Sequence, residues 1–288
     1  MERVSGAGGA ERRAPALRSG LLLKVAVPAV LAAMLAGAFF TMTPRPAAAP
    51  AAVSDAGSGT NAGASSLTLA SFADAMDRID DNERTFVAQV IGDSTGNEQG
   101  EWVDLAFREL ALRLDRPLVQ HPWDVLSSSY LAPITFNAEA SNAPLIVWNG
   151  SASGKTAAYS LTHIDALVPG EPDLVILNHG LNNVLEPAQV GEQFTSLIAG
   201  IEQRWPATIG YAALLENPRL DQYAAAHDEV IGHVAGWLVE HQAVRPIDVH
   251  SAYLESGDVP ALLLPDLLHP APVGSALTAA TVISALTR

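Results

Sequence analysis

The sequence predicts an α/β fold in which helices cover both faces of a parallel β-sheet. Short apolar runs alternate along the chain with longer segments whose apolar residues recur at helical spacing. A turn of glycine and polar residues follows most of these runs directly. Strands buried on both faces read as continuous apolar runs, because the crossover helices pack on both sides of a parallel sheet.

Five strands are predicted, at residues 85–91, 144–148, 173–177, 208–215 and 244–249. Helices are predicted between and after them, at residues 98–114, 155–167, 187–205, 219–241 and 272–286. Two of these helices begin with proline, which is favoured in the first helical turn. Residues 115–143 show no clear periodicity, and we expect an irregular insertion beside the site. One domain, residues 67–288, accommodates all of these elements.

The N-terminal part of the chain has a different character. Residues 1–24 form a basic segment, and residues 25–42 contain no charged side chain. As a helix this 18-residue run would be about 27 Å long, just enough to span a bilayer core. Five Lys or Arg precede it and Arg45 follows it, so the positive-inside rule places the body outside the membrane. We expect a signal anchor; the alternative is a signal peptide cleaved near Ala49-Pro50-Ala51, which would release a secreted body. Residues 43–66, which follow this run, are mostly Pro, Ala, Gly, Ser, Asn and Thr, which predicts a flexible linker.

The composition of the chain excludes several classes of function. The chain has no cysteine, which excludes a disulfide scaffold, a thiol nucleophile and a Cys-ligated zinc site. Beyond residue 45 it carries 10 basic and 29 acidic side chains, a balance that repels phosphate and argues against nucleic acid or nucleotide as a partner.

Candidate catalytic residues follow the predicted strands, where ligands bind to parallel sheets. Ser94 lies on a glycine-flanked turn after the first strand, Gly150 follows the second and Asn182 follows the third. Asp266 and His269 lie three residues apart, just before the last helix. Acyl transfer needs a hydroxyl nucleophile, an imidazole base, a group that orients the base, and donors for the oxyanion. These five residues supply each part.

The same segments resemble the sequence blocks of the SGNH/GDSL hydrolase family, in their order and in their places after the strands. Gly92-Asp93-Ser94 matches the first block, Gly150 the second, Asn182 the third, and Asp266 with His269 the final Asp-x-x-His. The third block usually ends in Asp, and here Asn183 takes that position. The layout is also similar to that of exported actinobacterial proteins.

The resemblance implies a flavodoxin-like three-layer α/β/α sandwich with a five-stranded parallel sheet, and hydrolysis of esters without a metal or cofactor. It implies Ser94 as nucleophile, His269 as base and Asp266 as its orienter. The oxyanion donors would be the backbone N–H groups of Ser94 and Gly150 and the side chain of Asn182. The substrate would be a small-molecule or polysaccharide ester. An O-acyltransferase with the same triad, or a glycan-binding module on the same fold, is the alternative.

Other patterns favour different functions. Gly92-x-Ser94-x-Gly96 also fits the nucleophile elbow of α/β-hydrolases, for which Asp248 would be the candidate acid. Residues 150–156 approach a phosphate-binding loop but have three residues between the glycines instead of four. His227 and His233 are six residues apart, which does not place them on one helical face as a zinc pair requires.

Overall fold

The structure, a computed structural model, describes residues 72–205 and 209–287. The predicted membrane helix at 25–42 and the linker at 43–66 lie outside these residues. Among the helices that are described, none is both long and apolar enough to cross a membrane.

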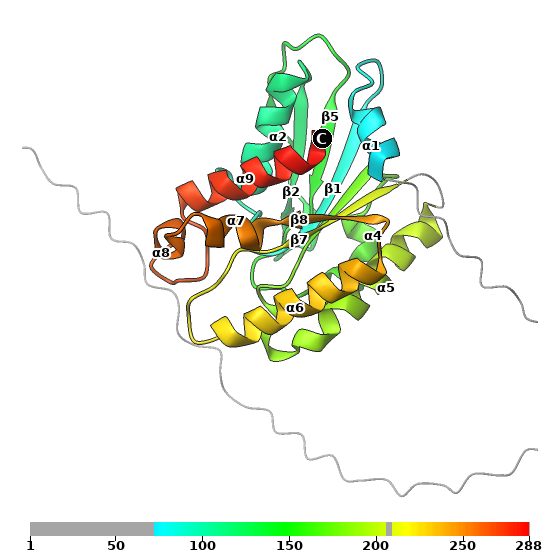
Figure 1. The fold of residues 1–288 in the computed structure, drawn as a ribbon. Helices are drawn as coiled ribbons and strands as arrows, with labels where there is room; N and C mark the ends of the chain where they lie inside the picture. The colour runs from blue at the N-terminus through cyan, green and yellow to red at the C-terminus, as the bar shows by residue number, and fades with distance from the viewer. Residues whose placement is uncertain (1–71, 206–208, 288) are drawn as a thin grey trace, which may run out of the picture. The chain divides into compact units, whose positions relative to one another are not determined.

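Six parallel strands form the middle layer of the body (Figure 1). Their spatial order is β2 (Leu118–Asp124), β5 (Leu145–Asn149), β1 (Phe86–Gly92), β6 (Leu174–Asn178), β7 (Gly210–Leu215) and β8 (Val244–Asp248). Two short strands, β3 (Ser129–Tyr130) and β4 (Ile134–Phe136), pair antiparallel with β2. Because β5 and β6 flank β1, the loops after these three strands are neighbours.

The prediction of five strands was wrong by one parallel strand. Residues 115–143 contain β2, β3 and β4 rather than an irregular insertion. Strand β2 was not predicted because Gln120, His121 and Pro122 interrupt its apolar pattern. Near the outer edge of the sheet, polar residues and a proline are tolerated in a way that the centre does not allow.

Helices cover both faces of the sheet and complete the three predicted layers (Figure 1). One face packs against α1 (Phe72–Ile79), α2 (Trp102–Arg113), α7 (Val249–Glu255), α8 (Val259–Leu262) and α9 (Pro272–Leu286). The other packs against α3 (Ala157–Thr162), α4 (Ile164–Leu167), α5 (Val190–Arg204) and α6 (Ala224–Glu240). Two single 3₁₀ turns, η1 (Asn183–Leu185) and η2 (Pro187–Gln189), precede α5.

The two cores follow from side-chain alternation along the strands. In β6, Leu174 and Ile176 enter one core, while Val175 and Leu177 enter the other. All five residues of β6 are buried, as expected for a central strand covered on both sides.

One helix boundary bears on the site. Helix α6 begins at Ala224, five residues later than the predicted start. The residues between β7 and α6 instead form a loop at the carboxyl end of the sheet, where Asn217 and Arg219 bond the loops that carry His269 and Asn182.

Candidate active site

Ser94 lies in a tight turn that begins where β1 ends. The carboxylate of Asp93 accepts hydrogen bonds from the backbone N–H and the hydroxyl of Thr95, both at 3.1 Å. The Asn178 amide, from the end of β6, donates to the same Thr95 hydroxyl at 2.9 Å. These bonds fix the turn, in which the Asp93 side chain accepts a backbone N–H, as aspartates in tight turns commonly do.

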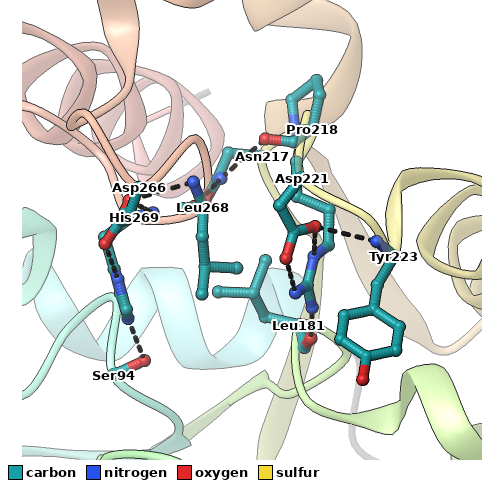
Figure 2. A network of polar contacts seen from close by, with 10 residues as sticks. Ser94, Leu181, Asn217, Pro218, Asp221, Tyr223, Asp266, Leu268 and His269 are labelled. Carbon is teal, nitrogen blue, oxygen red and sulfur yellow. Dashed lines mark hydrogen bonds and ion pairs between the residues drawn. The ribbon is translucent and has the colours of Figure 1, made fainter. Parts of the chain in front are cut away.

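Ser94, His269 and Asp266 are connected by a continuous line of hydrogen bonds (Figure 2). Ser94 Oγ lies 2.8 Å from His269 Nε2, and His269 Nδ1 lies 2.8 Å from Asp266 Oδ2. The other oxygen of Asp266 accepts the backbone N–H groups of Leu268 and His269, each at 3.0 Å. The geometry is that of a nucleophile, a base and a group that orients the base.

The Asp266 carboxylate stays ionised in this position. Partial burial raises its pKa, but the hydrogen bonds from the His269 ring and from two backbone N–H groups outweigh burial and hold the pKa below its usual value. An ionised Asp266 accepts a hydrogen bond from the Nδ1–H group of His269, which keeps the ring proton on Nδ1 and leaves Nε2 free to take a proton from Ser94.

Asn182 lies in the loop after β6, the strand that neighbours β1 in the sheet. Its Nδ2 donates to the carbonyl oxygen of Lys155 at 3.1 Å. A primary amide has two N–H groups, so the second remains available to a substrate oxygen. Asn182 therefore connects its own loop with the loop that follows β5.

Gly150 does not offer the free N–H that the sequence led us to expect. Its backbone N–H donates to the carbonyl of Val90 at 2.8 Å and lies 3.2 Å from that of Trp148. A Cβ at this position would lie 2.8 Å from Leu167 Cδ2 and 2.9 Å from Val90 O. Glycine is needed here for close packing against β1, and its N–H is used by the sheet.

Asp248, His227, His233 and a further histidine, His179, take no part in this line of hydrogen bonds. His179 is fully buried and pairs with Ser160 at 2.8 Å; burial lowers its pKa to about 3, so it is neutral. Asp248 caps α7 by accepting the Ser251 N–H at 2.8 Å. His227 is buried and His233 is exposed, so they share no face. Within the described residues, no group of three or more His, Asp and Glu is arranged to hold a metal.

A sequence profile described as the GDSL-like lipase/acylhydrolase family matches residues 90–277, about two thirds of the chain. The match runs from β1 into α9 and includes Ser94, Asp266 and His269. The chain belongs to this family. It is a GDSL-type acylhydrolase, an enzyme class that cleaves carboxylic esters.

Solved structures share the fold of this acylhydrolase at low sequence identity. A lipase/acylhydrolase from Enterococcus faecalis has a TM-score of 0.52 and 16% identity, covering 69% of this chain and 94% of that one. A carbohydrate esterase family 3 protein from Talaromyces cellulolyticus gives 0.52 and 16%, covering 69% and 95%. A catalytic mutant of an acetylxylan esterase from Geobacillus stearothermophilus gives 0.51 and 16%, covering 70% and 94%. A comparison with curated proteins returns no match.

Sequence reasoning missed one buried residue of the acylhydrolase site, Glu216. It directly follows β7 and is 2% exposed. Burial raises the pKa of Glu216 well above its usual value, and the nearby charge of Asp93 raises it further; burial also raises the pKa of Asp93 to about 6. We take Glu216 as the protonated partner that donates to Asp93. The only sequence signal was an acid at the carboxyl end of an apolar strand.

Proposed function

We propose that this acylhydrolase is an extracytoplasmic serine esterase that works through Ser94, His269 and Asp266. The observation that carries the proposal is the unbroken hydrogen-bonded line from Ser94 Oγ to the Asp266 carboxylate, with both links at 2.8 Å. Such a line lets the hydroxyl lose its proton as it attacks.

In the first half-reaction Ser94 Oγ attacks the ester carbonyl carbon and its proton passes to Nε2 of His269. The tetrahedral intermediate then collapses, the bond to the alcohol oxygen breaks, and His269 returns the proton to the leaving alcohol. Water attacks the resulting acyl-Ser94 in the second half-reaction and gives its proton to the same nitrogen. Release of the acid returns the proton to Ser94. Asp266 stays ionised and stabilises the imidazolium form of His269.

The oxyanion formed in each step needs donors close to Ser94. The backbone N–H of Ser94 has no hydrogen-bond partner in the described part of the chain, and the Asn182 amide has a second N–H to give. In place of Gly150 we propose the backbone N–H of Gly154. Gly154 is exposed, its N–H takes part in none of the described backbone hydrogen bonds, and the adjacent Lys155 is held by Asn182.

We propose a short acyl ester on a small molecule or a polysaccharide as the substrate. The side chains of His269 and Asp266 are 32% and 46% exposed, so the acid–base end of the triad is open to solvent. An open site suits an ester that is carried by a bulky alcohol such as a glycan. Two of the similar structures are described as a carbohydrate esterase and an acetylxylan esterase, which supports this choice.

The proposed location outside the membrane rests on the uncharged run at 25–42 and the excess of basic residues before it. Protease added to intact cells should then digest the body, residues 67–288. If the body stays intact until the cells are lysed, this location is incorrect.

The activity is tested with esters of one alcohol whose acyl chain lengthens from acetyl to decanoyl, alongside acetylated xylan. We expect the highest kcat/KM for acetyl esters and no activity in Ser94→Ala. Turnover by a folded Ser94→Ala protein would contradict the proposed nucleophile. A preference for decanoyl esters would contradict the proposed substrate.

A further inference from the structure

The segment from Glu216 to Asp221 contacts three segments of the proposed machinery: the Ser94 turn, the Asn182 loop and the Asp266–His269 loop. It follows β7, which neighbours β6 in the sheet, and Figure 2 shows its residues Asn217 and Asp221 near Leu268 of one loop and Leu181 of the other. We call residues 216–221 the clasp.

The clasp holds both backbone groups of Leu181, the residue before Asn182. Glu216 Oε2 accepts the Leu181 N–H at 2.5 Å, and Arg219 Nη1 donates to the Leu181 carbonyl at 2.6 Å. Glu216 comes this close because the neighbouring residue is Gly180, where a Cβ would lie 2.8 Å from Oε2. The backbone that leads into Asn182 is therefore held by hydrogen bonds at both the N–H and the carbonyl of Leu181.

Arg219 is itself held in place. Its guanidinium group is bound by both oxygens of Asp221, at 2.7 and 2.6 Å. Arg219 is only 6% exposed, and the bidentate pair restricts the plane in which its remaining N–H groups point. The contact with Leu181 is thus rigid.

The clasp also holds the Asp266–His269 loop. Asn217 Nδ2 donates to the Leu268 carbonyl at 3.2 Å, and the Leu220 N–H donates to the Leu267 carbonyl at 2.7 Å. Leu267 has a φ of 59°, a left-handed conformation that is unfavourable for a leucine. A strained residue persists only where its surroundings impose it, and the clasp supplies part of that constraint.

The third contact reaches the nucleophile turn. Glu216 and Asp93 are both buried and their side chains are hydrogen-bonding neighbours; burial raises the pKa of both carboxyl groups. Apart from this pairing, Asp93 Oδ2 and Glu216 Oε1 have no other partner in the described residues. Asp93 in turn fixes the Thr95 backbone and so the position of Ser94.

We propose that Glu216 and Arg219 are positioning residues, which hold the Asn182 amide and the Ser94 turn in register with His269. Glu216 acts through Leu181 on one side and Asp93 on the other; Arg219 acts through Leu181. This inference rests on the proposed function. It differs from a purely structural role because it predicts a change in kcat in variants that remain folded.

Glu216→Ala removes the acceptor of the Leu181 N–H and the partner of Asp93. We expect kcat to fall by about 10–10²-fold with little change in KM, because oxyanion contacts strengthen only in the transition state. Glu216→Gln should recover most of this loss. A glutamine oxygen still accepts the Leu181 N–H, and its NH₂ donates to Asp93 as protonated Glu216 does.

A double-mutant cycle tests whether Glu216 acts through Asn182. In an Asn182→Ala background, where the amide is already absent, Glu216→Ala should cost clearly less than it does alone. Losses that multiply in full would mean that the two residues act independently and would overturn the proposal.

Asp173→Ala is the matched control. Asp173 is also a buried carboxylate that accepts a backbone N–H, that of Val87 at 2.9 Å, and pairs with an arginine, Arg84 at 2.8 Å. It lies at the amino end of β6, opposite the site. We expect Asp173→Ala to lower the melting temperature without changing kcat.

A wild-type kcat in folded Glu216→Ala would also overturn the proposal. If Glu216→Ala does not fold, kcat is measured for Arg219→Gln alone and in the Asn182→Ala background, and the same two outcomes, a wild-type kcat or losses that multiply in full, would overturn the proposal. Ser94→Ala separates the two levels of inference: residual turnover there contradicts the proposed function itself, whatever the clasp variants do.

Discussion

Replacing Asp266 with asparagine tests the charge of the orienting group while keeping its shape. In Asp266→Asn the remaining side-chain oxygen can still accept the Leu268 and His269 N–H groups, which lie at 3.0 Å in the native protein, so the loop should keep its conformation. The new amide NH₂ would then face His269 Nδ1, which Asp266 Oδ2 contacts at 2.8 Å. Because an NH₂ group donates, Nδ1 must accept, and the ring proton moves to Nε2. In that tautomer Nε2 cannot take the proton of Ser94.

The size of the effect follows from the exposure of the pair. In an enclosed serine protease site the same change lowers kcat by roughly 10⁴-fold. Here the side chains of Asp266 and His269 are 46% and 32% exposed, so water can compete for Nδ1 and restore part of the active tautomer. We expect kcat to fall by about 10²–10³-fold, less than in Ser94→Ala or His269→Ala, with KM little changed.

Asp248→Asn is the matched control for this measurement. Asp248 is also an exposed aspartate that accepts a backbone N–H, that of Ser251 at 2.8 Å, but as the cap of α7. Asparagine caps a helix about as well as aspartate, so we expect wild-type kcat and melting temperature. Both variants are assayed on p-nitrophenyl acetate, with folding checked by circular dichroism. Loss of activity in Asp248→Asn with Asp266→Asn unaffected would refute the assignment of the acid.

Three further outcomes are expected. Asn182→Ala should lower kcat by about 10²–10³-fold, the usual cost of one oxyanion donor, and full activity on p-nitrophenyl acetate would exclude Asn182 from that role. Gly150→Ala should lower the free energy of unfolding in urea by about 1–3 kcal/mol, since its Cβ meets Val90 O at 2.9 Å; a loss of kcat at unchanged stability would return Gly150 to the oxyanion site. The raised pKa of Glu216 lets the folded chain keep a proton that the unfolded chain loses above about pH 4.3, so unfolding free energy should fall as pH rises from there, by up to about 1.4 kcal/mol per pH unit. Glu216→Gln should show a smaller slope, because only Asp93, whose pKa burial raises to about 6, then keeps an extra proton in the folded chain; equal slopes in both proteins would mean that Glu216 ionises normally.

The sequence predicted most of the fold because the central strands are continuous apolar runs. Strands β5 and β6 and helix α9 lie within a residue or two of their predicted bounds. Strand β2 was missed because polar residues and Pro122 break its pattern, and pairing with β5 compensates for them only in three dimensions. Local periodicity does not contain that information.

The site was predictable where its geometry is local. Asp266 and His269 are three residues apart, so their contact follows from the sequence. The use of the Gly150 N–H by Val90 depends on how β5 and β1 align, and sequence spacing does not reveal it. Glu216 was missed because its partners, Asp93 and Leu181, lie far from it along the chain.

The most direct test of the account is covalent capture of the nucleophile. A fluorophosphonate ester reacts with an activated serine and leaves a stable adduct that resembles the tetrahedral intermediate. Intact-mass and peptide mass spectrometry on the wild-type protein should find one adduct, on the peptide that contains Ser94, formed in step with the loss of esterase activity. His269→Ala should label far more slowly. An adduct on a different residue, or inactivation that leaves Ser94 unmodified, would contradict the central claim.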